Sequence, residues 1–389
     1  MKRKLICVLL VITVVALVAG CSKPAGTGTG SATASAKDVG MNIVPLVDDG
    51  SGAVLPIDQK AGPCGNMPVG VEAVLNLMTD EQKDAVRKGG YTAAISLHTT
   101  NADWSLLQLQ GIQVVLDEFN IELLASTDAE MKPDKQVSDI ESIIGLKPDL
   151  LISFVLDNDS LQPVLRKASD AGILISFIDS VPTGFKSPKD YIGMGAADNY
   201  ANGKASAQAL VDYLGGEGEI AMIHFVTGLF HTNQRSDGAR EIFDKYPNIK
   251  IVAEQQSDSA ETGATITESI LIAHPNLAGM WVFWDGPGMG AVGAIEQMGK
   301  NVKVTTVDLS EDTAYSIASG GAMLAAAAQH PYDQGVAEAI LGVAALAGVE
   351  NIPPYVVVPG EIVTKDSMAK SWERVFKTPV PADMAALLK

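Results

Sequence analysis

Several polar residues stand directly after short apolar runs, at the points where strands are predicted to end. Ligands of parallel α/β sheets bind beyond the carboxyl ends of the strands. Carboxylates and a guanidinium at that edge could form charge-assisted hydrogen bonds with a small polar ligand. The residues in these positions are Asp103-Trp104, Asp157, Asp179, Arg235, Asp285 and Asp308.

The sequence contains little that would favour an enzyme over a binding protein. The histidines form no HExxH motif, and no GxSxG motif occurs. Nothing in the sequence places two carboxylates on either side of a scissile bond. We therefore expect a protein that is not an enzyme, with no catalytic residues and no metal site.

One glycine motif resembles a cofactor signature. Gly288-Met-Gly290-Ala-Val-Gly293 reads GxGxxG before a predicted helix, and Asp308 ends the next predicted strand, as in a dinucleotide-binding fingerprint. Asp285-Gly286-Pro287 separates the motif from its strand, which loosens the turn that holds a pyrophosphate. Glycines that pack helices explain the motif better, and we expect no cofactor. A tethered oxidoreductase stays an unfavoured alternative.

The elements that must position these residues alternate along the chain. Short apolar runs separated by helical patterns predict βαβ units and parallel sheets. Eight such units exceed one ordinary sheet, so we expect an α/β protein of two doubly wound lobes. Predicted strands cover 91–97, 121–125, 149–155, 173–178, 218–225, 249–253, 279–284 and 302–307. Predicted helices include 134–145, 160–171, 200–214, 232–245, 261–273 and 288–299, besides one through Leu106–Leu116.

The N-terminus indicates export. A basic start is followed by an apolar stretch that is too short for a confident membrane span, as in a signal peptide over 1–20. Its end, Leu17-Val-Ala-Gly-Cys21, resembles a bacterial lipobox, in which Cys21 becomes lipidated and anchors the chain to the membrane. Cys7 leaves with the signal, so Cys64 has no intramolecular disulfide partner and a disulfide framework is excluded.

The charge and composition of the chain limit the kinds of molecule that it is expected to bind. The net charge is −18, and removing the three cations of the signal gives −21 for the mature chain. No basic block offsets this charge, so nucleic-acid binding is not expected. Residues 21–40 are rich in Gly, Ser, Thr and Ala and predict a flexible tether. Residues 41–90 form an extension of unclear role, in which a capping box at Thr79–Gln82 opens a short helix.

The ordered set of strand-end segments resembles the ribose-binding-protein-like (type I periplasmic) family of solute-binding proteins between Tyr91 and Thr364. The resemblance implies two lobes joined by three crossings. It places 91–197 with 330–359 in the first lobe, and 198–329 with 360–380 in the second. The matching segments are Asn101–Gly111, Ile178-Asp179, Asp198-Asn199 with Gly203-Lys204, Thr232–Arg235 with Asp237-Gly238, Ala273–Pro275, Trp284-Asp285, Val307-Asp308 and Gln329–Gly335.

The resemblance also implies roles in ligand binding. Asp179 and Asp308 would accept hydrogen bonds from hydroxyls, and Arg235 would hold a ring oxygen and a hydroxyl together. Trp104 would stack on the ligand, and Trp284 replaces the amide that commonly stands at its position. Ser180 replaces an arginine of ribose binders, so ribose itself is disfavoured. Further implied lining residues are His98, Asp103, Asn233, Asp285 and Gln329.

The function implied by the resemblance is capture of a sugar or polyol outside the cytoplasm for an ABC permease, on a lipid-anchored chain. A sensor subunit, which would present its ligand-bound form to a signalling receptor, remains the alternative. Pentoses, hexoses, deoxysugars, polyols and nucleosides all stay open as ligands.

Overall fold

The computed structural model describes residues 54–226 and 228–389. The predicted signal peptide over 1–20, the lipid-accepting Cys21, the tether over 21–40 and the first residues of the extension lie outside these described residues.

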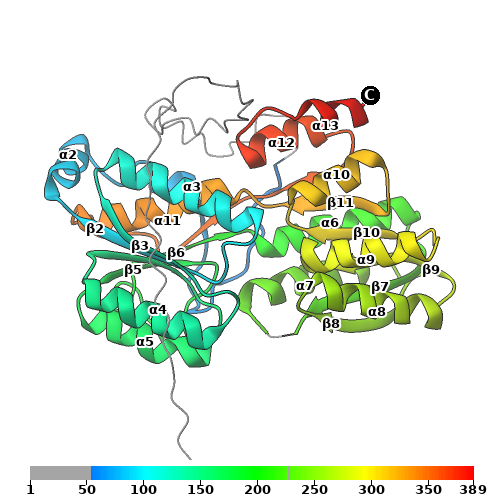
Figure 1. Ribbon diagram of the computed structural model, residues 1–389, viewed down its shortest axis with the longest axis horizontal. Helices are drawn as coiled ribbons and strands as arrows, with labels where there is room; N and C mark the ends of the chain where they lie inside the picture. Colours follow the sequence, from blue (N-terminus) through cyan, green and yellow to red (C-terminus); the bar gives the residue numbers. More distant parts are fainter. Residues whose placement is uncertain (1–53, 227) are drawn as a thin grey trace, which may run out of the picture. The chain divides into compact units, whose positions relative to one another are not determined.

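Seven parallel strands form the first sheet, in the order β1-β12-β6-β5-β4-β2-β3. Helices α3 (Asp103–Glu118) and α11 (Pro331–Leu346) pack together on one face, and α4 (Pro133–Leu146) and α5 (Asn158–Asp170) cover the other (Figure 1). The strands are β1 (Val69–Gly70), β2 (Thr92–Leu97), β3 (Glu122–Asp128), β4 (Leu150–Phe154), β5 (Leu174–Ile178), β6 (Gly193–Ala197) and β12 (Tyr355–Val358).

Six strands form the second sheet, in the order β13-β11-β10-β9-β7-β8, with only the edge strand β13 antiparallel. Helices α6 (Asn199–Leu214) and α7 (Phe230–Phe243) pack on one face, and α8 (Ala260–Ala273) and α9 (Asp285–Gln297) on the other. The strands are β7 (Gly218–Phe225), β8 (Ile249–Ser257), β9 (Leu277–Val282), β10 (Lys303–Val307), β11 (Met323–Ala328) and β13 (Glu361–Val363).

The remaining helices lie before and after this framework. Helix α1 (Glu72–Leu75) and helix α2 (Asp80–Gly89) precede β2. The predicted capping box is confirmed, because Thr79 and Gln82 exchange side-chain and backbone hydrogen bonds at the start of α2. Helix α10 (Glu311–Ser319) follows β10, and α12 (Met368–Phe376) and α13 (Ala382–Leu387) end the chain.

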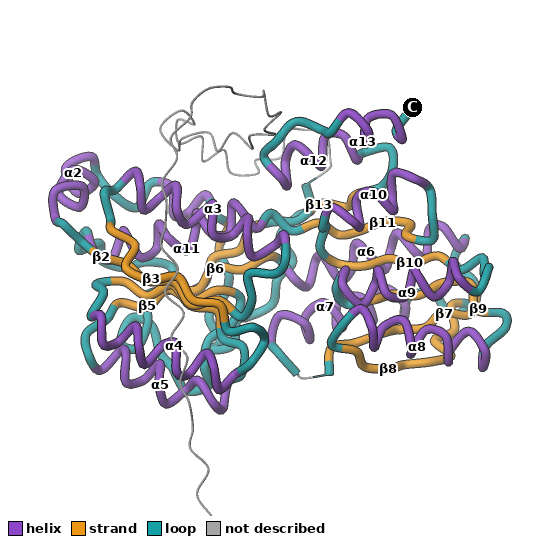
Figure 2. Tube along the Cα trace, in the orientation of Figure 1, coloured by secondary structure: helices purple, strands orange, loops and turns teal. Residues whose placement is uncertain are grey.

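Between β6 and β13, the described chain passes from one sheet to the other three times. It crosses after Ala197 at the end of β6, after Ala328 at the end of β11, and after Val358 at the end of β12. Figure 2 shows that helices flank the strands of each sheet. The predicted α/β class, with two parallel-sheet lobes joined by three crossings, is confirmed.

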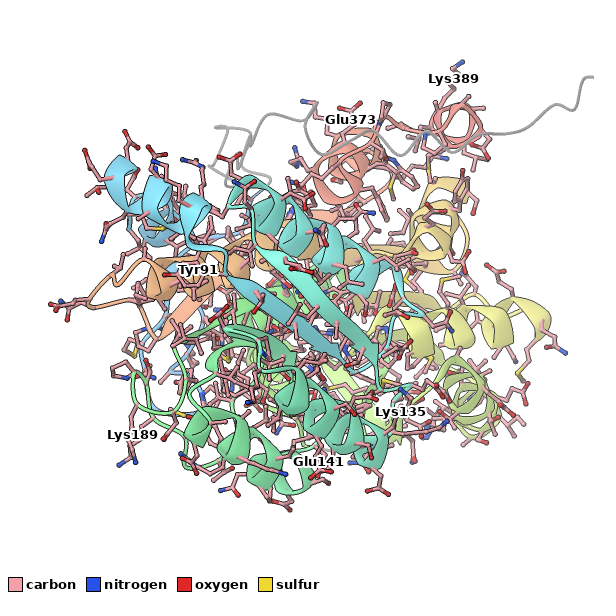
Figure 3. All side chains as sticks on the ribbon, turned by 60° about the vertical axis from the view of Figure 1, so that its left-hand side comes forward. Tyr91, Lys135, Glu141, Lys189, Glu373 and Lys389 are labelled. Atoms are coloured by element: carbon pink, nitrogen blue, oxygen red, sulfur yellow. The ribbon has the colours of Figure 1, made fainter. Side chains whose placement is uncertain are left out.

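The apolar runs of the sequence became strands because helices cover both faces of each sheet. All five residues of β4 are buried, and each large aliphatic side chain hidden in this way contributes about 1.5–3 kcal/mol. Charged side chains lie on the outside, as Glu141 on α4 and Glu373 on α12 show (Figure 3).

Three helix pairs approach one another through reciprocal glycines. A Cβ on Gly111 of α3 would lie 2.0 Å from the Tyr332 carbonyl oxygen, and one on Gly335 of α11 would lie 2.2 Å from that of Gln108. Helices α6 and α7 meet in the same way at Gly203 and Gly238, and α8 and α9 at Gly263 and Gly290. The obstructing atoms are all backbone, so these positions require glycine.

Candidate functional site

Asp179 and Asp308 occupy equivalent places, directly after β5 and β10. Both have left-handed backbone conformations, with φ of 56° and 76°. Their amides are held by the neighbouring strands, because Asp179 N donates to Gly195 O (2.8 Å) and Asp308 N to Ala327 O (3.0 Å). A left-handed non-glycine residue costs free energy and is frequent at functional sites. The sheet edges therefore fix two carboxylates in an unusual backbone geometry.

Arg235 is almost fully buried in α7, where three acceptors hold its guanidinium. Its Nε donates to Asn199 Oδ1 (2.8 Å), and its Nη1 donates to Phe283 O (3.2 Å) and to Asp308 Oδ2 (3.1 Å). The carbonyl of Arg235 lies where the Cβ of any other residue at Gly203 would stand. The glycine contact between α6 and α7 thus sets the position of this arginine.

Gln329 lies at the second crossing and connects elements of both lobes. Its Oε1 accepts from Trp104 Nε1 (3.1 Å) and from Gln334 Nε2 (2.9 Å), while its Nε2 donates to Asp308 Oδ1. Buried Gln108 extends this chain by donating to Gln334 Oε1 (2.8 Å). A continuous row of amides therefore leads from α3 to the Asp308 carboxylate.

These groups meet in a cavity of about 230 Å³ that side chains of both lobes line. Each sheet reverses its strand order at one strand, β2 in the first and β7 in the second. Such a reversal opens a crevice between neighbouring carboxyl ends, and ligands of doubly wound sheets bind there. The cavity lies at both reversals, because His98 follows β2 and Phe225 ends β7.

Aromatic side chains and two imidazoles line much of the cavity, beside aliphatic and small polar residues. The ring of His98 stacks on Phe154 at 4.1 Å, and Trp104 meets Phe154 edge-on at 6.3 Å between centroids. His231 of the second lobe approaches Phe154 at 5.6 Å, so rings of the two lobes touch. The Trp284 indole lines the cavity from the start of α9. Such walls offer flat apolar faces around a few fixed polar groups.

Burial governs the charges in this cavity. Burial raises the pKa of Asp179 to about 7, with the Arg235 cation opposing and the Asp308 carboxylate adding to the rise. Burial lowers the pKa of His98 to about 4, and it lowers that of His231 well below the ordinary value, helped by Arg235. Both imidazoles are neutral at pH 7 and can each donate and accept one hydrogen bond.

A second cavity of about 330 Å³ adjoins the first and is lined by two further aspartates of the predicted set, Asp103 and Asp285. Asp103 of the first lobe accepts a hydrogen bond from Glu311 N of the second (2.8 Å). Asp285 accepts from Ser310 N (3.0 Å) and from the Thr313 hydroxyl (3.4 Å), and burial raises its pKa to about 6. Asp103 thus joins the lobes, and Asp285 fastens the start of α10.

The structure therefore brings most of the predicted set together. Asn233 is exposed and Asp157 is the N-cap of α5, and neither is among the lining residues of these two cavities. Lining residues that the sequence reasoning left out of its site include Asn101, Phe154, His231, Thr232 and Phe283. Asn101 stood in a matching segment and His231 lies one helical turn before Arg235, so both carried a usable signal.

The GxGxxG segment packs helices. Helix α9 begins at Asp285, so the three residues expected to separate the motif from the strand form the first turn of the helix. A Cβ on Gly290 would lie 2.0 Å from Ala260 O of α8, while nothing lies within 4 Å of one on Gly293. Gly290 therefore serves the contact between helices, as the sequence interpretation favoured.

Comparison with known proteins agrees with this geometry. The periplasmic binding protein domain family matches residues 93–350. The ribose import binding protein of Bacillus subtilis is 26% identical over 59% of this chain and 73% of its own. A xylitol-binding protein of Mycolicibacterium smegmatis is 27% identical over 68% of this chain and 75% of its own. The solved structure of an ABC transporter periplasmic solute-binding protein from Actinobacillus succinogenes with bound D-allose superposes with a TM-score of 0.65 at 27% identity, over 72% of this chain and 99% of that one.

Proposed function

Because the chain belongs to the periplasmic binding protein domain family, we propose that it captures a sugar or polyol between its lobes and delivers it to an ABC-type importer. One observation carries the proposal most directly. Asp179, Arg235 and Asp308 converge from both lobes on a cavity that five aromatic side chains and two imidazoles also line. A ligand with several hydroxyls and an apolar C–H face matches both features.

We propose Asp308, Asp179 and Arg235 as the polar ligand contacts. A carboxylate oxygen accepts from a hydroxyl more strongly than a neutral acceptor does, and the fork of an arginine can donate to two oxygens at once. Trp104 and Trp284 would cover the apolar faces of the ligand, and Gln329 would brace Asp308. Asp103 and Asp285 lie beside this site, and exposed Asn233 is left out of it.

A screen of ligands tests the proposal. The full-length chain in detergent is heated alone and with D-ribose, D-allose, xylitol and nucleosides. A ligand at 100 times its dissociation constant stabilises the folded state by about 2.7 kcal/mol, which raises the melting temperature measurably. A sugar or polyol should give the largest shift, and calorimetry should show one site per chain. Stabilisation by nucleosides alone would contradict the proposed ligand class.

Members of this family bind solutes and release them, so we propose that no chemical step accompanies binding. The bound sugar should be recovered unchanged after long incubation with the protein, as judged by mass spectrometry. Catalytic consumption of the sugar would contradict this proposal.

A periplasmic binding protein acts outside the cytoplasmic membrane, and we propose that a lipid on Cys21 anchors this one. The support is the lipobox-like end of the N-terminal apolar stretch. Across residues 54–226 and 228–389, no helix has the length and apolar character needed to cross a bilayer. Cys21→Ser should abolish labelling with radioactive palmitate and release the protein from membranes. Unchanged labelling of that variant would refute the anchor.

A further inference from the structure

Residues 54–70, named here the hinge strap and drawn in blue in Figure 1, precede the residues that the family matches. The start of the strap is fixed to the second lobe. Val54 forms an antiparallel bridge with Glu361 of β13, and Leu55 N donates to Gly360 O (2.8 Å). Asp58 forms an ion pair with Lys204 of α6. The strap therefore begins as an addition to the second sheet.

The end of the strap is fixed to the first lobe. Gly62 lies against the ring of Tyr355 in β12, where a Cβ would come within 2.9 Å of that ring. Asn66 Nδ2 donates to the Tyr191 hydroxyl (3.3 Å), and β1 pairs with β12 in the first sheet. The exposed residues Lys60 and Ala61 lie between the two fixed parts. The strap thus passes from one lobe to the other, beside the three crossings.

Gln59 joins the strap to the elements that hold the ligand-binding arginine. Its Oε1 accepts from Tyr200 N (3.1 Å) at the start of α6, and its Nε2 donates to Gln234 Oε1 (3.3 Å) on α7. These partners are the sequence neighbours of Asn199 and Arg235, whose side chains bond to one another. The backbone amides of Asp58 and Gln59 also donate to Asp198 Oδ2, at the first crossing.

The strap contacts coexist with direct contacts between the cleft walls. In the same arrangement Glu311 N of the second lobe donates to Asp103 of the first, and the rings of Phe154 and His231 meet. Rotation of one lobe against the other would separate both pairs. It would also pull on the strap, whose two ends are fixed to different lobes.

We propose that the hinge strap is a fourth connection between the lobes, which favours the arrangement with the cleft walls in contact and holds Arg235 in its binding position. Only Lys60 and Ala61 separate the two fixed parts, so moving the lobes apart must stretch this short link or break strap contacts. A cost that only one arrangement bears shifts the equilibrium towards the other, and the apparent affinity for a ligand rises with the population of the binding arrangement. Weakening the strap therefore raises the population of the separated arrangement and speeds ligand release.

Slackening the strap tests this idea without any ligand. An insertion of about eight Gly and Ser residues between Lys60 and Ala61 adds a coil of roughly 16 Å and leaves both fixed parts intact. The amide of Glu311 reports on wall contact, because its hydrogen bond crosses the lobes. Hydrogen exchange measured on the full-length apo chain should be about tenfold faster at this amide, while an equal insertion after exposed Gly299 should leave its rate unchanged.

Two results of the exchange experiment would overturn the proposal. Equal protection of Glu311 with the tight and the slack strap would show that the strap does not restrain the lobes. Equal acceleration of the core amides of β4 and β7 would make the strap a general stabiliser of the fold.

A second variant tests the role of Gln59, and this arm rests on the proposed function. Gln59→Ala should release bound D-ribose, xylitol or D-allose about tenfold faster in stopped-flow tryptophan fluorescence, as expected when two neutral hydrogen bonds are lost. Gln162→Ala, which removes a hydrogen bond to Thr183 O within the first lobe, is the control. Equal release rates would contradict the positioning role of Gln59. If none of these sugars binds the wild type, the proposed function fails, and the exchange experiment still decides the role of the strap.

Discussion

Replacing Asp308 by asparagine should weaken ligand binding and also destabilise the empty protein. Asparagine is similar in shape and tolerates the left-handed backbone that Asp308 adopts, so the sheet edge should stay in place. The change removes the charge that faces Arg235 Nη1 at 3.1 Å. Arg235 donates to one carboxylate oxygen of Asp308 and Gln329 donates to the other. In asparagine one of these oxygens becomes an NH2 group, which is itself a donor and so faces one of the two donors without an acceptor.

The size of both effects follows from these bonds. A hydrogen bond to a charged acceptor contributes about 1.5–3 kcal/mol and one to a neutral acceptor about 0.5–1.5 kcal/mol. Each ligand hydroxyl that donates to Asp308 thus loses about 1–1.5 kcal/mol, which is roughly a five- to thirteenfold loss of affinity. The empty protein loses a similar amount of stability, because the buried Arg235 guanidinium loses its charged partner.

Calorimetric titration of the full-length chain with the sugar found by screening measures the first effect, and urea unfolding measures the second. Asp157→Asn is the matched control, because Asp157 also follows a strand but serves as the N-cap of α5. It should leave affinity unchanged. Reduced stability of Asp308→Asn with unchanged affinity would show that Asp308 only supports the fold, and the proposed site would be wrong.

Three further predictions follow from the same geometry. Burial raises the pKa of Asp179 to about 7, so its carboxyl is protonated in the empty protein below that pH. Because the ligand hydroxyl needs the carboxylate as acceptor, ligand affinity should increase up to about tenfold per pH unit as the pH approaches 7 from below. Calorimetry across this range should show the slope in the wild type and none in Asp179→Asn; a slope retained in that variant would assign the titration to another group. Gly290→Ala should destabilise the protein by about 1–3 kcal/mol in urea unfolding through its clash with α8, whereas Gly293→Ala, where space is open, should not; equal stability of the two variants would contradict the packing role. Ligand should change the tryptophan fluorescence, less so in Trp104→Phe or Trp284→Phe, and an unchanged spectrum on saturation would argue against stacking.

Most strands with large apolar side chains were predicted from the sequence, although apolar β12 (Tyr355–Val358) was missed, and the strands built of small residues were missed as well. Strands β2, β4, β5 and β10 follow the predicted runs within a residue or two at each end. Strand β6, Gly193-Met-Gly-Ala-Ala197, gave no apolar signal. A Cβ at Gly195 would meet the Glu338 side chain of α11 at 2.4 Å, so close packing of a helix on the sheet explains the small residues. Strand β11 escaped prediction because only Met323 and Leu324 are large, and the four residues that follow them are alanines.

The candidate site was predictable to the extent that it depends on strand ends. Asp179, Asp308 and the start of α9 at Trp284 follow from that rule. The position of Asn233 on helix α7 explains why it lies outside the cavity. Two residues along a helix turn a side chain by about 200°, so Asn233 points away from the side of Arg235, whereas His231, four residues before Arg235, lies on the same side. Phe154 belongs to the first lobe and Phe283 to the second, and both line the cavity where the lobes face each other. The pattern of apolar residues in a single strand does not show which residues of the other lobe it will face.

The reciprocal glycines also bear on how this sequence can change over time. At Gly111 and Gly335, as at the other two pairs, the atom that excludes a side chain is a backbone carbonyl oxygen of the partner helix. No second substitution can remove a carbonyl, so a lost glycine has no compensating mutation nearby. Each pair also joins helices that carry or adjoin a proposed ligand residue. Among related sequences these six glycines should therefore be constant even where the sugar differs. A map of invariant positions would show them beside the proposed ligand contacts, although none of the six lines either cavity.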